Sequence, residues 1–323
     1  MRRLQHMGVA DVLRINEPDV RERPVRLELG DDWLRFSYGD VEVDLDAVSA
    51  VWYRKGGFWF DNLMPKPALA GHPTLAANMS GKLAHEDSRA REYFHHLLAS
   101  RARTLGHAGI AGLNKLVVLS IARKLGLATP VSIVSNRREP FVCAAGGRSL
   151  VTKALSDGVY LWDFSESQAA YFSYTERVSP AQLAQLPEEM PLSLAQLEIE
   201  KDFEVRSFYL DGDFYSTAIF SQTDESTAVD YRKYNYEKQN RNVPYRLPID
   251  IEEKLRRLFA TLGLNTGSVD LIVDRCGRHH FLEINPSGQY EGLSQICNYD
   301  LDGKIAEWLA GAHDAGQEVC LGR

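Results

Sequence analysis

The sequence has few cysteines and no long apolar run, and each absence excludes a class of protein. Four cysteines occur among the 323 residues, and none of them stands in a Cys-x-x-Cys pair. A disulfide framework and a thiolate zinc site are therefore not predicted. No segment approaches the roughly 18 apolar residues of a membrane span, and no signal-peptide pattern follows Met1. The sequence predicts a cytoplasmic protein with no membrane partner.

Basic charge is also scarce. The chain has 37 Lys and Arg against 44 Asp and Glu, which gives a net charge of −7. Proteins that bind nucleic acids generally carry an excess of basic residues, so no nucleic-acid partner is predicted. Hydrophobic residues make up 44% of the chain, as in globular proteins that bury a core. At about 150 residues per domain, the length predicts two domains.

Two common phosphate-binding motifs are missing as well. The sequence contains no P-loop, and the spacing of Gly106, Gly109 and Gly112 differs from the dinucleotide fingerprint. Predicted strands and helices interleave without a regular strand–helix–strand repeat, which favours an α+β fold. The segment 101–112 is rich in Gly and Arg. We therefore predict a boundary there, with domains at 1–110 and 111–323.

The most informative pattern is a predicted hairpin over 268–286. A loop at 275–278 would place Asp270 opposite Glu283, with Asn285 on the same face two residues further on. The other, apolar face would carry Val269, Leu271, Val273, Leu282 and Ile284. Facing carboxylates repel unless a cation lies between them, and three oxygen ligands suit Mg²⁺. The alternative is a solvated acidic face that holds no metal.

Two lysines could hold the phosphates that such a metal would accompany. Lys115 lies near the start of an amphipathic helix, and Lys153 ends a strand before a polar loop. Taken alone, each is more simply explained as an exposed solubilising residue. The segment 196–206 largely alternates apolar and charged residues, which predicts a half-buried strand.

Together these segments resemble the ATP-grasp superfamily and, within it, the peptide ligases that mature graspetides. The likeness is greatest to the grasp-with-spasm type and more distant to microviridin-type ligases. It rests on residues 51–54, 114–115, 151–153, 196–206, 230–234, 240–245, 281–286 and 288–289. The resemblance implies an ATP-grasp fold that binds ATP between two α+β lobes. An N-terminal lobe would span 1–110, a central lobe about 111–195, and a C-terminal lobe about 196–323.

The resemblance also implies roles for individual residues. Lys115 and Lys153 match the lysines that bind the ATP phosphates. The matches to the adenine hinge are Gln196, Leu197, Glu198 and Ile199. Asp202 is a weaker match to the residue that contacts the ribose. The matches to the magnesium ligands are Asp270, Glu283 and Asn285. Arg206 and Arg232 match the arginines near the γ-phosphate and the acceptor carboxylate, and residues 156–160 match a lid over the phosphates.

One departure from the family concerns the start of the chain. Members usually begin with a short apolar strand and then a helix that ends in a phrase like residues 13–16 here. This sequence starts partway through that helix. We therefore expect a shortened N-terminal lobe, with the ATP-binding positions unaffected.

The implied activity uses ATP and Mg²⁺ to phosphorylate an Asp or Glu side chain of a ribosomal precursor peptide. A Thr or Ser hydroxyl, or a Lys amine, of the same peptide then attacks the acyl phosphate and closes an ester or amide ring. The basic segment 230–246 suits an acidic peptide, although alone it would be read as a solvated loop. The family also suggests a homodimer.

Two alternatives remain open at this point. One is an ATP-grasp ligase that joins a free amino acid to a peptide or protein carboxylate. The other is a nucleotide-dependent peptide-binding module without catalysis, which the intact lysines and metal-ligand matches disfavour. His107, His279 and His280 are interpreted as ordinary surface or turn residues.

Overall fold

The computed structural model describes residues 1–9, 11–15, 25–29, 34–54, 71–110, 112–156, 160–163, 169–172, 175–221 and 241–311. The chain forms two compact units, one of Met1–Ala111 with Asp300–Arg323 and the other of Gly112–Tyr299. The helix Leu301–Ala310 therefore belongs to the first unit, whereas the predicted domain boundary had placed these residues in the second domain. Among the described residues, no helix combines the length and apolar character needed to cross a membrane.

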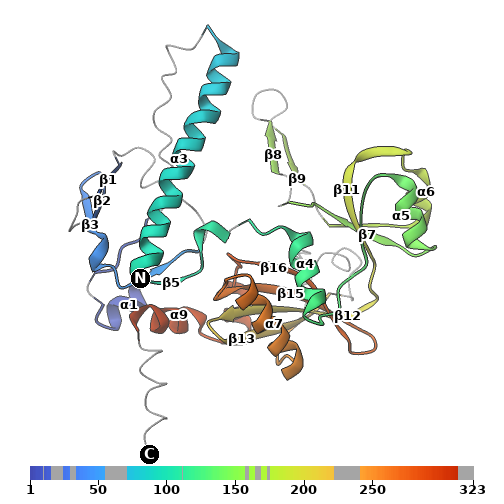
Figure 1. Ribbon diagram of the computed structural model, residues 1–323. Helices are drawn as coiled ribbons and strands as arrows, with labels where there is room; N and C mark the ends of the chain where they lie inside the picture. The colour runs from blue at the N-terminus through green and yellow to red at the C-terminus, as the bar shows by residue number, and fades with distance from the viewer. Residues whose placement is uncertain are drawn as a thin grey trace, which may run out of the picture. The chain divides into compact units, whose positions relative to one another are not determined.

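The first unit combines a small antiparallel sheet with a long helix (Figure 1). The sheet has the order β1-β2-β3, and β4 and β5 form a separate parallel pair. These strands are β1 (Val25–Leu29), β2 (Leu34–Tyr38), β3 (Val41–Asp44), β4 (Ala50–Trp52) and β5 (Arg103–Leu105). The helical elements are α1 (Arg2–His6), η1 (Leu45–Ala47), α3 (Pro73–Arg101), η2 (Ala108–Ile110) and α9 (Leu301–Ala310).

Only the C-terminal part of α3 contributes to a core. Its buried residues are Phe94, Leu97 and Leu98, which pack with Phe36 and Tyr38 of β2. Alternation along β2 turns these two rings to the same side, which explains why one helix face covers them. Among the described residues of this 29-residue helix, no others belong to that apolar cluster.

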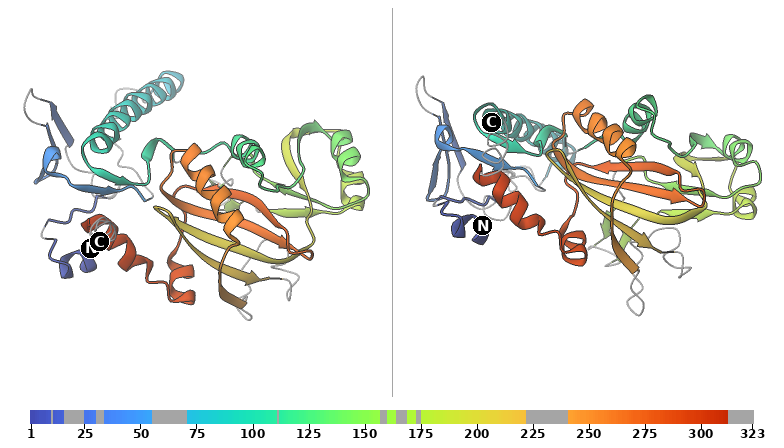
Figure 2. Two further views of the ribbon diagram at one scale, coloured as in Figure 1. Left: turned by 60° about the horizontal axis from the view of Figure 1, so that its bottom comes forward. Right: turned by 90° about the horizontal axis from the view of Figure 1, so that it is seen from below.

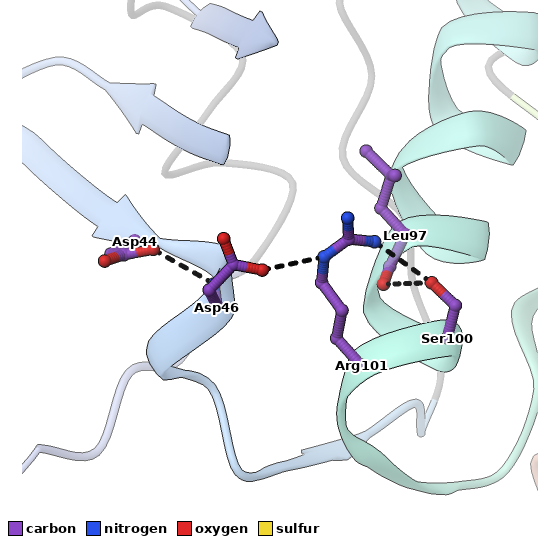
Figure 3. Close-up of polar contacts among 5 residues, drawn as sticks. All are labelled: Asp44, Asp46, Leu97, Ser100 and Arg101. Atoms are coloured by element: carbon purple, nitrogen blue, oxygen red, sulfur yellow. Dashed lines mark hydrogen bonds and ion pairs between the residues drawn. The ribbon is translucent and has the colours of Figure 1, made fainter. Parts of the chain in front are cut away.

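A polar contact ties the end of α3 to the 3-10 turn η1 (Figure 3). Arg101 Nε donates to Asp46 Oδ1 at 2.8 Å, and Asp44 accepts the backbone N–H of Asp46 at 3.0 Å. Arg101 also reaches the hydroxyl of Ser100 at 3.1 Å. The pair is exposed, so its stabilising effect is small and the apolar cluster holds the helix.

The second unit begins with a four-stranded sheet in the order β10-β7-β11-β6. Its strands are β6 (Ser132–Arg137), β7 (Leu150–Lys153), β10 (Glu176–Val178) and β11 (Glu189–Leu197). Helices α5 (Arg138–Ala145) and α6 (Pro180–Gln185) pack against this sheet. Their residues Phe141 and Leu183 form a core with Leu150 and Ala195 of the strands. A separate hairpin of β8 (Tyr160–Asp163) and β9 (Ala169–Phe172) follows β7 in the chain.

A five-stranded antiparallel sheet makes up the rest of this unit. The order is β14-β13-β12-β15-β16, with β12 (Lys201–Leu210), β13 (Asp213–Phe220), β14 (Arg241–Tyr245), β15 (Thr266–Asp274) and β16 (His279–Asn285). Figure 2 shows α7 (Ile249–Thr261) against one face of this sheet, where Phe259 stacks on Tyr209 at 4.1 Å between ring centroids. Helix α4 (Lys115–Lys124) contacts β16 and α7, and α8 (Glu291–Cys297) contacts β13 and β14.

The predicted hairpin is confirmed with one correction. Asp270 pairs with Glu283, as predicted, and residues 275–278 form the loop. An irregularity follows, because Leu271 pairs with Phe281 and leaves Leu282 as an extra residue in β16. Such a bulge reverses the alternation of the strand. Phe281 therefore takes the fully buried position that the sequence predicted for Leu282.

The first unit yields a pH-dependence prediction at His95 of α3. Its ring lies edge-on to Tyr53 at 5.4 Å between centroids, and burial lowers its pKa from 6.5 to about 4, helped by Arg91 and His107. The unfolded chain therefore binds more protons than the folded chain between these pH values. We predict that stability falls by about 2 kcal/mol as the pH drops from 6.5 to 4.

Denaturant unfolding across this pH range measures the effect. His95→Gln should flatten the pH dependence, whereas His96→Gln, at an exposed neighbouring position, should leave it unchanged. An identical pH dependence in wild type and His95→Gln would show that the buried imidazole makes no such contribution.

Candidate active site

Three charged residues form a row across three neighbouring strands of the five-stranded sheet. Arg206 of β12 pairs with Asp270 of β15, which in turn pairs with Glu283 of β16. Paired residues of antiparallel strands point to the same side, so all three side chains share one face. Arg206 NH1 lies 3.9 Å from Asp270 Oδ1, and these side chains are only 18% and 21% exposed. On the sheet face opposite α7, the charged side chains of this row are therefore mostly buried.

Lys153 brings a second cation to this row from a different sheet. Its Nζ lies 3.7 Å from Glu283 Oε2, and its side chain is 12% exposed. Burial lowers the pKa of Lys153, while the Glu283 carboxylate opposes that shift. The site thus pairs two acidic side chains with two cations in a poorly solvated place, where charge interactions are stronger than in water.

Asn285 completes the predicted metal-ligand set on the same face. It pairs with Ser268, two residues from the Asp270–Glu283 pair. Its Oδ1 accepts the backbone N–H of Ser287 at 3.1 Å, which fixes the side-chain amide. In the described part of the chain, no three His, Cys, Asp or Glu side chains cluster as metal ligands. The set of two carboxylates and one amide oxygen fits Mg²⁺, which prefers oxygen ligands and retains water.

The predicted adenine hinge consists of the last two residues of β11 and the first two residues after it. Gln196 is buried, and its Nε2 donates to Ser132 Oγ at 2.9 Å. The backbone N–H groups of Leu197 and Glu198 donate to the carbonyls of Val131 (2.9 Å) and Ser149 (3.1 Å). These bonds hold the end of β11 in place, and the Glu198 side chain also pairs with Arg177 at 2.8 Å. Ile199 and Glu200 then connect the hinge to β12.

Lys115 occupies the first turn of α4, where Asn114 caps the helix by accepting the N–H groups of Leu116 and Val117. Its Nζ donates to the carbonyl of Ser156 at 2.7 Å and contacts that of Ala154 at 3.4 Å. Lys115 therefore contacts the chain that directly follows β7. The structure thereby brings both predicted phosphate lysines to the same strand end.

Several predicted features lie outside the described residues, namely Arg232, residues 157–159 of the predicted lid and most of the basic segment 230–246. The two histidines of the hairpin have specific partners: His279 Nε2 bonds with the Tyr245 hydroxyl at 2.9 Å, and His280 Nε2 bonds with Asp274 at 2.8 Å.

Sequence reasoning gave no role to the buried pair of Lys201 and Glu204. An extra residue in β12, Asp202, interrupts the pairing with β15, so Lys201 turns to the face that carries Glu204 and Arg206. Asp202, the predicted ribose contact, is exposed. Strict alternation hid this arrangement, because it placed Asp202 rather than Lys201 beside Glu204.

The turn after Asn285 yields a prediction at Gly288. A Cβ atom added there would lie 2.6 Å from the backbone nitrogen of Ser268, closer than real contacts allow. Gly288 N–H also donates to the Asn285 carbonyl at 3.1 Å. Gly288→Ala should therefore displace this turn, lower stability by about 1–3 kcal/mol and weaken Mg²⁺-dependent ADP binding.

Thermal unfolding and calorimetry of Mg·ADP binding measure these two effects. Gly292→Ala in α8 is the matched control, because nothing lies within 4 Å of its added Cβ. Equal stability and affinity in the two variants would contradict a close approach of Gly288 to β15.

The chain is similar to solved structures of a peptide macrocyclase and of an ATP-grasp ligase. The macrocyclase MdnC of Microcystis aeruginosa MRC, bound with its precursor peptide MdnA, is 26% identical, with a TM-score of 0.74. The alignment covers 96% of this chain and 94% of MdnC. An ATP-grasp ligase of Chryseobacterium gregarium, associated with ribosomally made peptides and complexed with ADP and a leader and core peptide, is 24% identical. Its TM-score is 0.76, over 96% of this chain and 91% of that one.

MdnB, also from Microcystis aeruginosa MRC, gives a TM-score of 0.67 at 21% identity, over 95% of this chain and 92% of MdnB. No protein-family model and no curated protein sequence matches the chain. The prediction of an ATP-grasp fold is confirmed by these structures. The assignment to the grasp-with-spasm type stays a prediction.

Proposed function

We propose that this chain is an ATP-dependent peptide macrocyclase that activates Asp or Glu side chains of a precursor peptide and joins them to other side chains. The observation that carries the proposal is the row of Arg206, Asp270 and Glu283 with Lys153 beside it. A substrate carboxylate and a nucleotide phosphate repel each other. Cations held in place at low exposure offset that repulsion.

We assign the phosphates of ATP to Lys115 and Lys153, and a magnesium ion to Asp270, Glu283 and Asn285. When bound, Mg²⁺ neutralises phosphate charge during transfer. A bound phosphate would favour the charged form of Lys153, as Glu283 already does, and would oppose the effect of burial on its pKa. Arg206 lies in register with the metal ligands, and we assign it, with Arg232, to the γ-phosphate and the acceptor carboxylate.

For adenine we assign the backbone of the hinge residues Gln196 to Ile199. The N–H groups of Leu197 and Glu198 already donate to Val131 and Ser149. Ile199 N–H is therefore the donor that we assign to the adenine ring. An adenine held there lies at the start of β12, and this strand leads directly to Arg206.

The proposed reaction has two steps. A carboxylate oxygen of the peptide first attacks the γ-phosphorus, and ADP leaves. A hydroxyl or amine of the same peptide then attacks the acyl carbon, phosphate leaves, and the nucleophile loses its proton. Each ring therefore costs one ATP, and the peptide loses the elements of one water. Thr or Ser would give an ester, and Lys would give an amide.

The peptide substrate follows from the precursor peptides bound in the related structures and from exposed basic residues here. MdnC was solved with MdnA, and the Chryseobacterium ligase with leader and core peptides. In the described part of the basic segment, Arg241 and Arg246 are exposed, which suits an acidic peptide. We further propose a homodimer that works in the cytoplasm, and light scattering of the purified chain tests its size.

Mass spectrometry tests the proposed activity. The chain is produced with each short peptide that is encoded beside its gene and is rich in Asp or Glu and Thr or Ser. A product that is lighter by one or more waters is expected. Glu283→Ala should reduce its formation about 100-fold or more, because it removes a metal ligand beside Lys153. Glu253→Ala, exposed on α7, should leave formation unchanged.

Other products would point elsewhere. Gain of an amino-acid residue mass would show a ligase that adds free amino acids and would refute macrocyclisation. An unmodified peptide that binds together with ATP would refute catalysis on that peptide and favour a binding module.

A further inference from the structure

Lys201, Glu204 and Ser221 form a buried charged cluster that the proposed reaction does not use directly. Glu204 pairs with Lys201, and Ser221 donates its hydroxyl to Glu204 Oε1 at 2.9 Å. The Lys201 and Glu204 side chains are 8% and 11% exposed, less than those of Asp270 and Glu283. Ser221 is fully buried. A buried ion pair contributes little net stability, so its presence invites a second explanation.

The cluster lies on the face that carries the candidate active site. Glu204 pairs with Ile272, and Arg206 pairs with Asp270, which is the next row on that face. Residues two apart in a strand point to the same side, so Glu204 and Arg206 are neighbours. Lys201 joins them only because the extra residue Asp202 interrupts the pairing. In a regular strand, residues three apart would lie on opposite faces.

Two carboxylates therefore share the sheet face of Arg206. Asp270 is 3.9 Å away in the next strand, and Glu204 precedes Arg206 by two residues on its own strand. Burial raises the pKa of Glu204 and Asp270 adds to this, while Lys201 and Ser221 lower it. The two carboxylates thus influence each other across the strands. Lys201 and Ser221 favour the charged form of Glu204 and bind its carboxylate.

We propose that Lys201 is a positioning residue, which holds the charge of Glu204 so that Arg206 stays directed toward Asp270 and the terminal phosphate of ATP. The inference rests on the proposed function, because it takes Arg206 as a γ-phosphate contact. Without Lys201, Glu204 competes for the guanidinium and draws it along β12. The γ-phosphate then loses a charged partner, while contacts to adenine, ribose and the β-phosphate are unaffected.

Calorimetry with Mg·AMPPNP and Mg·ADP separates this role from a general one, because only the first ligand has a γ-phosphate. The readout is the ratio of their dissociation constants. In Lys201→Met the ratio for AMPPNP over ADP should rise about 10-fold, with ADP affinity within about twofold of wild type. Adding Glu204→Gln to that variant should restore the ratio to within about threefold of wild type, because the competing charge is gone.

A matched control is Lys254→Met, which breaks the Lys254–Asp250 ion pair on α7 of the same unit. Its ratio should equal that of wild type. Should Lys201→Met not fold, Ser221→Ala removes the second anchor of Glu204 with a smaller change. Its ratio should rise about threefold, and an unchanged ratio would overturn the proposal.

Two further results would overturn the inference. Equal loss of affinity for both nucleotides would make Lys201 a contact of adenine, ribose or the β-phosphate. An unchanged ratio in Lys201→Met would show that Glu204 does not compete for Arg206. A wild-type chain that bound neither nucleotide would instead refute the proposed ATP site itself, and the inference with it.

Discussion

Repulsion between two carboxylates that face each other across adjacent strands is the constraint on which the second unit depends. Asp270 and Glu283 are paired in register and mostly shielded from water. Such a pair is stable only when cations stand beside it. Arg206 supplies one from β12, and Lys153 supplies the other from a different sheet. The folded chain thus holds two carboxylates and two cations close together.

The five-stranded sheet meets this constraint by keeping its two faces chemically distinct. One face buries Val205, Leu271 and Phe281 completely or nearly so, and the face opposite carries the charged row. Two extra residues, Asp202 in β12 and Leu282 in β16, adjust which side chains reach each face. Both irregularities flank the charged row. Bulges next to functional sites commonly redirect a side chain in this way.

Some features of the candidate site could be predicted from the sequence, because they depend on residues that are close together in the chain. The pairing of Asp270 with Glu283 followed from the length of one hairpin loop, and the helix that begins at Lys115 followed from its apolar spacing. Similarity in motif order predicted the ATP-grasp fold, which the solved structures confirm. The burial of Phe281 at the position predicted for Leu282 could not be foreseen, because a bulge leaves no regular pattern in the sequence.

The amino-acid pattern alone was sufficient for the last hairpin, for the pairing of Asp270 with Glu283 and for the helix near Lys115. These features depend on residues that are close in the chain, where side-chain periodicity is informative. Three-dimensional folding was needed to bring Lys153 to Glu283, and to bury Lys201 against Glu204 beside Arg206. Contacts of this kind join separate strands or depend on a local break in pairing. Their geometry arises only when the sheets pack and the buried charges find partners.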